Sequence, residues 1–311
     1  MVNRDPSESV VEVTDLSRQF GSTMALDGIS LRVQLGLVYG LVGANGAGKT
    51  TLIKHLLGSL RAKQGSVRVF GMDPVRNPVE VLRRIGYLSE DRDLPEWMRI
   101  DELMRLTAAC HPNWDSDYGR ELLATFGLDV SKQIQHLSKG MRAQTGLIAA
   151  VAHRPDLLLL DEPSTGLDAV VRRDILNEII RAVADDGRTA IFSSHLLDEV
   201  ELMSDYVFMM DEGKMVLEGS LDDIKAQHQQ LSVRSSSDAP PPIEGILSAQ
   251  RQGDTWSLVC NGASQSIHAA LQEQGIEVIK SRYASLQEIF VARVGHDRHA
   301  SRSETPVAEE A

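Results

Sequence analysis

The chain has 311 residues, enough for about two domains if a typical domain holds roughly 150. Hydrophobic residues make up 42% of it and charged residues 24%, which excludes wholesale disorder and a disulfide-stabilised mini-protein. The 32 Lys and Arg against 44 Asp and Glu leave a net charge of −12, whereas binding a nucleic-acid backbone needs clustered cations. We therefore expect no nucleic-acid partner.

The cysteines and the hydropathy pattern indicate the cellular compartment and whether a membrane-spanning segment is expected. Cys110 and Cys260 lie far apart and form no CxxC pair, so metal and redox motifs are not indicated and a reducing cytosolic compartment is expected. Residues 1–10 are polar and are not typical of a secretory signal. The longest apolar run, Leu35–Ala44, has ten residues, whereas a membrane-spanning helix needs about 18. Any role at a membrane should therefore depend on a partner protein.

The first half of the chain begins with strands and then becomes helical. Apolar runs predict strands at Val10–Thr14, Ile29–Val33, Val38–Val42 and Ser66–Phe70. A glycine-rich turn follows the third of them and leads into a helix from about Lys49 to Leu57, which Gly58 ends. From about 90 to 152 the pattern predicts helices with few strands.

The second half alternates strands and helices before a separate segment. We predict strands at Leu157–Asp161 and Thr189–Ser194 with a helix over 171–183 between them, then a hairpin, Tyr206–Met210 with Met215–Glu218. A capping box at Ser220 predicts a helix over Leu221–Gln229, and the Ser/Pro-rich stretch Ser235–Pro242 reads as a linker. Folded periodicity returns from Ile246 to about Val294 as strand, strand, helix, strand, helix, and a polar tail begins at Gly295.

Residues 43–50 match the phosphate-binding pattern G-x-x-x-x-G-K-[ST], with a predicted strand before them and a helix after them. Glycines there let backbone N–H groups point at an anion, and the helix adds its positive dipole end. Lys49 would reach the β- and γ-phosphates, and Thr50 would offer a hydroxyl to Mg²⁺. A chance match by a glycine-rich turn is disfavoured by the flanking elements. The expected nucleotide contacts are Gly43, Ala44, Asn45, Gly46, Ala47, Gly48, Lys49, Thr50 and Thr51.

Two carboxylates follow a buried strand. Leu157–Leu160 is apolar and leads into Asp161 and Glu162, and the carboxyl end of a strand is where an α/β sheet places its site. We expect Asp161 to hold Mg²⁺ through water and Glu162 to polarise the attacking water. Solvated acids at a strand end are the alternative, which the upstream phosphate loop disfavours.

With these motifs, the chain resembles the nucleotide-binding subunits of ATP-binding cassette (ABC) transporters. Leu137–Met141 is similar to that family's Leu-Ser-Gly-Gly-Gln signature, although an isolated pentapeptide of this kind could also be a plain helix cap. Ser138 and Gly140 at a helix start would form a second anion site. The resemblance implies that Ser138 of one subunit meets the γ-phosphate held by another, so two copies would close around ATP.

Further matches occur in the family's order. Residues 164–168 resemble the D-loop, so Asp168 is expected near the nucleotide, and His195 matches the switch histidine that contacts the γ-phosphate. Phe20 lies where the family stacks an aromatic ring on adenine, although a core Phe fits equally. Glu90 stands where the family carries Gln; it could meet Mg²⁺ through water but adds negative charge. Lys139 and Met141 also depart from the signature.

The resemblance covers about residues 8–230. It implies an α/β P-loop ATPase domain over 1–230, with a mainly parallel sheet, an antiparallel β subdomain and a helical subdomain at about 90–155. Residues 231–294 would form a small α+β C-terminal domain, similar to the extension of ABC-2-type exporters, and 295–311 a disordered tail. We expect Glu162, His195 and Lys49 to be catalytic, ATP and Mg²⁺ to be bound, and Thr50, Asp161 and Glu90 to face the metal.

The function that the resemblance implies is ATP hydrolysis that powers a separate membrane permease, with export as the expected direction. The subunit would form a homodimer, or a heterodimer with a related ATPase, and would be cytoplasmic at the inner face of the cell membrane. The alternative is a soluble ABC ATPase that acts outside transport. The interval between Thr50 and Leu137 is too short for the coiled coil of chromosome-type ATPases, and the chain has one cassette rather than two.

Overall fold

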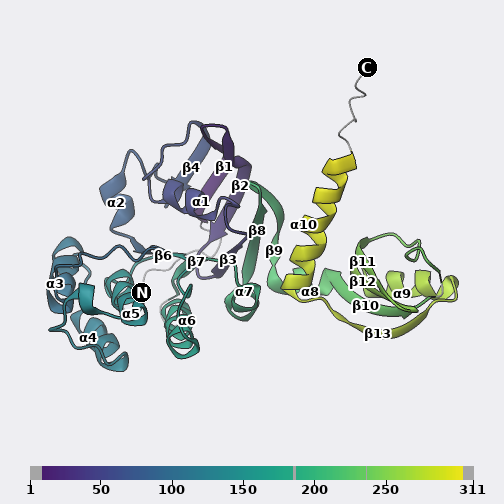
Figure 1. Cartoon of the computed structure of the whole chain (residues 1–311). Helices are drawn as coiled ribbons and strands as arrows, with labels where there is room; N and C mark the ends of the chain where they lie inside the picture. The colour runs from purple at the N-terminus through teal and green to yellow at the C-terminus, as the bar shows by residue number, and fades with distance from the viewer. Residues whose placement is uncertain (1–8, 185–186, 236, 304–311) are drawn as a thin grey trace, which may run out of the picture. The chain divides into compact units, whose positions relative to one another are not determined.

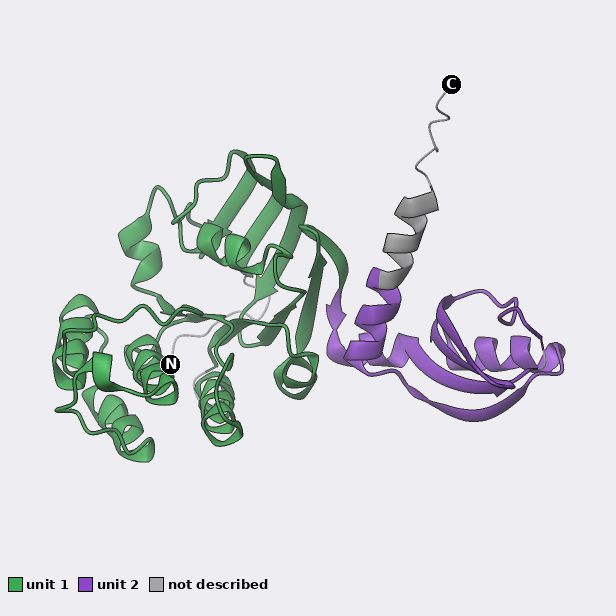
Figure 2. Cartoon of the chain, viewed as in Figure 1, with its two compact units in different colours: residues 1–217 green, residues 218–311 purple. Residues whose placement is uncertain are grey.

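The computed structural model describes residues 9–184, 187–235 and 237–303 and divides into two compact units, 1–217 and 218–311 (Figure 2). The division lies earlier than the boundary at 230 that the sequence predicts. Strand β9 (Lys214–Ser220) spans it as the last strand of the large sheet, and helix α8 (Leu221–Gln227) belongs to the second unit.

The first unit contains a three-stranded antiparallel sheet in the order β2-β1-β4 (Figure 1). Its strands β1 and β2 extend beyond the predicted runs because Leu16 and Leu26 are also buried in the core. The bounds are β1 Ser9–Phe20, β2 Thr23–Gln34 and β4 Gln64–Val69.

The second sheet of this unit has six strands in the order β5-β6-β7-β3-β8-β9. The pairs β5–β6, β6–β7, β7–β3 and β3–β8 are parallel, which confirms the predicted mainly parallel sheet. Glu212 and Gly213 both have positive φ and form the two-residue turn between β8 and β9. The remaining bounds are β3 Val38–Val42, β5 Ile85–Leu88, β6 Leu157–Asp161, β7 Thr189–Ser194 and β8 Tyr206–Asp211.

Side-chain alternation along β6 decides which face of the sheet carries the acids. Leu157 and Leu159 pack in the core cluster that surrounds helix α1 (Lys49–Leu56), between the two sheets. Because side chains alternate along a strand, Asp161 lies on the same face as these leucines. The strand therefore delivers Asp161 to the face on which α1 begins.

Helices complete the first unit, and α3, α4 and α5 lie together as a helical subdomain (Figure 1). Helix α5 contacts β5, α3, α4 and α6, whereas α6 packs on β7 and α7 on β3. In the described part of the chain, no helix is both long enough and apolar enough to cross a bilayer. The bounds are α2 Pro78–Leu82, α3 Ile100–Cys110, α4 Ser116–Thr125, α5 Lys139–Val151, α6 Ala169–Ala184 and α7 Leu197–Met203.

The second unit is an α+β domain with a four-stranded antiparallel sheet in the order β11-β12-β10-β13. The helix predicted over Leu221–Gln229 ends at Gln227, because His228 already starts β10. The last helix runs to Ser303, past the predicted start of the tail at Gly295, and 304–311 lie outside the described residues. The bounds are β10 His228–Arg234, β11 Ile246–Gln252, β12 Thr255–Asn261, α9 Ser264–Glu273, β13 Glu277–Tyr283 and α10 Leu286–Ser303.

Candidate functional site

Adjacent parallel strands bring the sequence-predicted residues together. Strands β3, β7, β6 and β5 are successive neighbours, so the loops after them leave the same edge of the sheet. The register pairs Val42 with Ser194 and Asp161 with Ser193. Glu162 and His195, which both follow the phosphate loop by more than 100 residues in the sequence, therefore lie beside it in the fold.

The phosphate loop is a close-packed turn ahead of α1. A Cβ at Gly43 would collide with the carbonyl oxygen of Met210, and one at Gly48, whose φ is +104°, would collide with that of Ala25. Glycine is therefore required at both positions. Lys49 is 6% exposed, and its Nζ donates to the carbonyl oxygen of Gly43 at 2.7 Å. The loop thus fixes the ammonium group at the start of the helix.

Glu162 is the centre of the site's electrostatics. Its backbone N–H donates to Ser193 Oγ at 2.9 Å, and its Oε1 lies 3.2 Å from Lys49 Nζ. Its Oε2 accepts from Thr165 Oγ1 at 2.8 Å and lies 2.7 Å from His195 Nδ1. Burial raises the pKa of Glu162, but the Thr165 hydrogen bond, Lys49 and His195 together outweigh burial and hold it below its usual value. The carboxylate is therefore ionised at neutral pH, as a base must be.

Replacing Thr165 with valine should move the acid limb of the ATPase pH profile to higher pH. Valine keeps the shape of threonine but removes the hydroxyl that donates to Glu162, so the pKa of Glu162 should rise. A base is lost as the pH falls through its pKa, and a raised pKa brings that loss to a higher pH. Turnover measured against pH checks this, with Thr125→Val on helix α4 as the control. An unshifted limb in Thr165→Val would contradict it.

The donor set around the phosphate loop fits a nucleotide with Mg²⁺. A cavity of about 240 Å³ is lined by phosphate-loop residues, Thr50, Glu90 and Glu162. Asp161 is buried and its Oδ1 accepts from Ser193 Oγ at 2.6 Å, which orients the carboxylate. Hydroxyl and carboxylate oxygens are the ligands that Mg²⁺ prefers. Among the described residues, Glu162 Oε1 is buried without a hydrogen-bond partner and faces Lys49, so this edge of the cavity can accept a donor.

Phe20 is not among the described residues that line the phosphate-loop cavity. It is at the end of β1, is 45% exposed, and the Arg18 guanidinium lies 4.6 Å from the centre of its ring. Thr23 and Ala25, which follow it in the hairpin, do line the phosphate-loop cavity. Stacking on adenine by Phe20 remains a prediction.

Ser138 of the signature and Asp168 of the D-loop each accept backbone N–H groups at the start of a helix. Ser138 is the N-cap of α5 and its Oγ accepts the N–H of Met141 at 3.2 Å. Asp168 Oδ1 accepts the N–H groups of Val170 and Val171, both at 3.0 Å, at the start of α6. None of Ser138, Gly140 and Asp168 is among the described residues that line the phosphate-loop cavity. Their expected contact with a nucleotide would therefore have to be made to another copy.

Sequence reasoning missed a buried anchor, Glu199 on helix α7. Its Oε2 accepts from Ser164 Oγ at 2.6 Å and from Ser194 Oγ at 3.2 Å, and its Oε1 lies 3.4 Å from Arg172 Nε. It thereby ties the segment after Glu162 to the end of β7. The acidic start of α7 was the available signal, but an acid there is equally typical of a solvated first turn.

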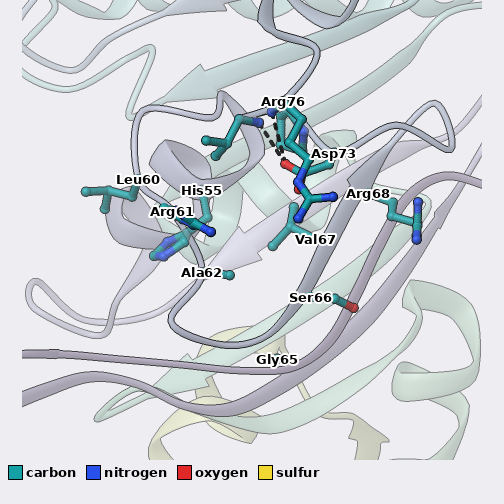
Figure 3. A pocket seen from close by; sticks show the side chains of 12 residues that line it. His55, Leu60, Arg61, Ala62, Gly65, Ser66, Val67, Arg68, Asp73 and Arg76 are labelled. Atoms are coloured by element: carbon teal, nitrogen blue, oxygen red, sulfur yellow. Dashed lines mark hydrogen bonds and ion pairs between the residues drawn. The ribbon is translucent and has the colours of Figure 1, made fainter.

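A larger cavity lies away from these groups, at the far end of α1 (Figure 3). It has a volume of about 370 Å³, and Asp73 at its rim accepts from the N–H of Val75 at 2.9 Å and of Arg76 at 3.3 Å. Its described lining contains none of the residues predicted to bind nucleotide. The chemistry of the lining residues, rather than cavity size, therefore makes the phosphate-loop cavity the candidate nucleotide site.

Comparison with known proteins identifies the family. Residues 26–165 match the ABC transporter family. The chain is 32% identical to the daunorubicin/doxorubicin resistance ATP-binding protein of Streptomyces peucetius over 99% of each chain, and 30% identical to the bacitracin transport ATP-binding protein of Bacillus licheniformis over 92% and 98%. A solved ATP-binding subunit of an ABC transporter is 30% identical with a TM-score of 0.65, covering 70% of this chain and 92% of that one. A dimeric cassette solved after hydrolysis with ADP and Pi shares the fold, with a TM-score of 0.61 at 18% identity over 68% and 98%.

Proposed function

Because this chain belongs to the ABC transporter family as its ATP-hydrolysing subunit, we propose that Glu162, Lys49 and His195 carry out the hydrolysis. The observation that carries the proposal is the carboxylate of Glu162, which contacts both other residues within 3.2 Å. A buried, ionised carboxylate beside a phosphate loop is placed to orient water and accept its proton.

In the proposed mechanism, some residues neutralise charge on the phosphates and others position the reacting groups. Lys49 exchanges its contacts with Gly43 and Glu162 for phosphate oxygens when ATP enters, which leaves Glu162 facing the water. His195, held at its Nδ1 by Glu162, presents its other ring nitrogen to the γ-phosphate. Thr50, Asp161 and Glu90 would hold Mg²⁺, and the bound ion would supply positive charge to the phosphates.

Two subunits complete one site. The proposed dimer is head-to-tail, so that Ser138 and the Gly140 N–H of one copy meet the γ-phosphate held by the other. The start of α5 supports this, because N–H groups at a helix N-terminus bind anions and the first turn of α5 carries no acid. One chain contains every motif, so a homodimer has two complete sites; a heterodimer with a related ATPase would use the same surfaces.

The permease is proposed to bind in a groove beside the helical subdomain. This subdomain groove has a volume of about 820 Å³ and lies between α2, the loop after β5, the end of α3, and α5. Val79 and Leu82 on its rim are exposed apolar side chains. A permease segment seated there would place the chain at the inner face of the membrane, and the drug-resistance and bacitracin-transport relatives favour export.

Docking in the groove should protect Cys110 from alkylation. Cys110 is exposed and lines the groove, whereas Cys260 is buried and burial raises the pKa of its thiol to about 11, so a maleimide labels Cys110 selectively. Co-expression with a candidate permease, a multi-span membrane protein from a neighbouring gene, should slow that labelling at least several-fold. Labelling measured by mass spectrometry checks the prediction.

The control is a cysteine at an exposed position of the antiparallel sheet region, Lys63→Cys in a Cys110→Ser background, whose labelling should not change. If Cys110 reacts at the same rate in a purified complex, the groove is not the docking site. If no membrane protein co-purifies, a soluble ABC ATPase becomes the better description.

A further inference from the structure

Arg92 is a buried cation that the hydrolysis scheme above leaves unused. It follows Glu90 and Asp91 in the loop after β5 and is 3% exposed. Its backbone φ is +51°, a value that residues other than glycine rarely adopt. Such a backbone conformation persists only where surrounding contacts hold it. The contacts that hold Arg92 therefore indicate what the loop is built to do.

Those contacts lead to the segment that follows Glu162. Arg92 Nη2 donates to the carbonyl oxygen of Thr165 at 2.9 Å and to that of Pro163 at 3.3 Å. Thr165 in turn donates its hydroxyl to Glu162 Oε2 at 2.8 Å. One residue thus separates the Arg92 guanidinium from the proposed catalytic carboxylate.

The same segment is held from its other side by Glu199, which accepts from Ser164 Oγ at 2.6 Å. Glu199 lies on α7, which packs on β3 and β7 of the central sheet, so that anchor is fixed. Arg92 lies on a loop, and its side chain lines both the subdomain groove and a cavity shared by Glu90 and Lys139.

We propose that Arg92 is a positioning residue that sets the orientation of Glu162 through the backbone of Pro163–Thr165. The inference rests on the proposed role of Glu162. A guanidinium suits this task because its planar Nη2 carries two N–H groups in fixed directions, one for each carbonyl oxygen, whereas a lysine ammonium has no fixed geometry.

The test is the steady-state ATPase of the full chain with Arg92→Ala and Arg92→Lys. Both should lower kcat at least tenfold while KM for ATP stays within about threefold, because the phosphate loop is untouched. Guanidinium chloride at tens of millimolar should partly restore kcat in Arg92→Ala, whereas the same concentration of ammonium chloride should not. Rescue by the missing functional group is a readout that a loss of folding stability does not produce.

A second buried arginine is the matched control. Arg188 is 2% exposed and precedes β7, at the opposite end of that strand from His195, so Arg188→Ala should lower Tm and leave kcat unchanged. The inference is overturned if Arg92→Ala keeps wild-type kcat, or if it lowers Tm as Arg188→Ala does and guanidinium restores nothing. Should Glu162→Gln itself retain turnover, the proposed role of Glu162 fails instead, which separates the two failures.

Discussion

Replacing Glu162 with glutamine is expected to lower kcat for ATP about 10³-fold, within the range that a general base contributes. Glutamine has the same size and can still accept from Thr165 and His195, so the local geometry should persist. It lacks the negative charge that accepts the proton of water. It also frees Lys49 from its 3.2 Å ion pair, so ATP binding should be kept or strengthened.

A variant that binds ATP without cleaving it should accumulate as a closed dimer. Sedimentation of Glu162→Gln at saturating ATP should show dimers, and a disulfide should form between chains from Asn45→Cys and Lys139→Cys in a Cys110→Ser background. The matched control is Glu178→Gln, another buried carboxylate, which accepts from the hydroxyl of Tyr118 on α4 and contacts none of the site residues named here. That control should keep wild-type turnover. Dimers that never form, with no disulfide between chains, would refute the head-to-tail arrangement.

Replacing Lys49 with alanine should weaken ATP binding roughly 100-fold. Charge-assisted hydrogen bonds are worth about 1.5–3 kcal/mol each, and 2.8 kcal/mol corresponds to about two decades in Kd. Lys49 is also one of the groups that lower the pKa of Glu162, so the variant should lose turnover beyond its loss of affinity. Isothermal titration with ATP and Mg²⁺ measures the first effect, and kcat at saturating ATP measures the second.

Lys54 provides the control for Lys49. It lies on the same helix and is exposed, so Lys54→Ala removes the same charge and leaves the phosphate loop unchanged. Its ATP affinity should match that of the wild type. Equal affinities for Lys49→Ala and the wild type would show that Lys49 does not contact the phosphates.

Local sequence patterns predicted most of the first unit because burial of an apolar run and the geometry of a tight turn depend mainly on neighbouring residues. The apolar run at Leu157–Asp161 and the glycine-rich turn before Lys49 specify a buried strand and a tight turn wherever they occur. The pattern did not predict β5, α2 and α7, which are short and receive their stability from packing against neighbours. The strand β10 was missed for a related reason: Gln229 and Gln230 are buried there, and polar residues carry no strand signal.

The residues of the site likewise divide into those that a local motif predicts and those that only distant contacts place. Lys49 and Glu162 sit at fixed places in recognisable motifs, so their proximity could be predicted from the edge of a parallel sheet. Arg92 and Glu199 have no such motif, because a charged side chain in a loop or first helical turn is ordinarily solvated. Both are buried only because distant segments supply partners, the carbonyl oxygen of Thr165 and the hydroxyl of Ser164.

The sequence by itself determined that this protein binds a nucleoside triphosphate, since the turn, the lysine and the helix that hold phosphate are contiguous over 43–56. The tertiary structure decided how the carboxylate of Glu162, the proposed base, is held. Thr165 follows it in the same segment, but Lys49 and His195 come from the segments after β3 and β7, which reach Glu162 only because β3 pairs with β7 and β7 with β6 in parallel. Strand order and register depend on long-range packing of the whole sheet, and no local pattern of residues contains that information.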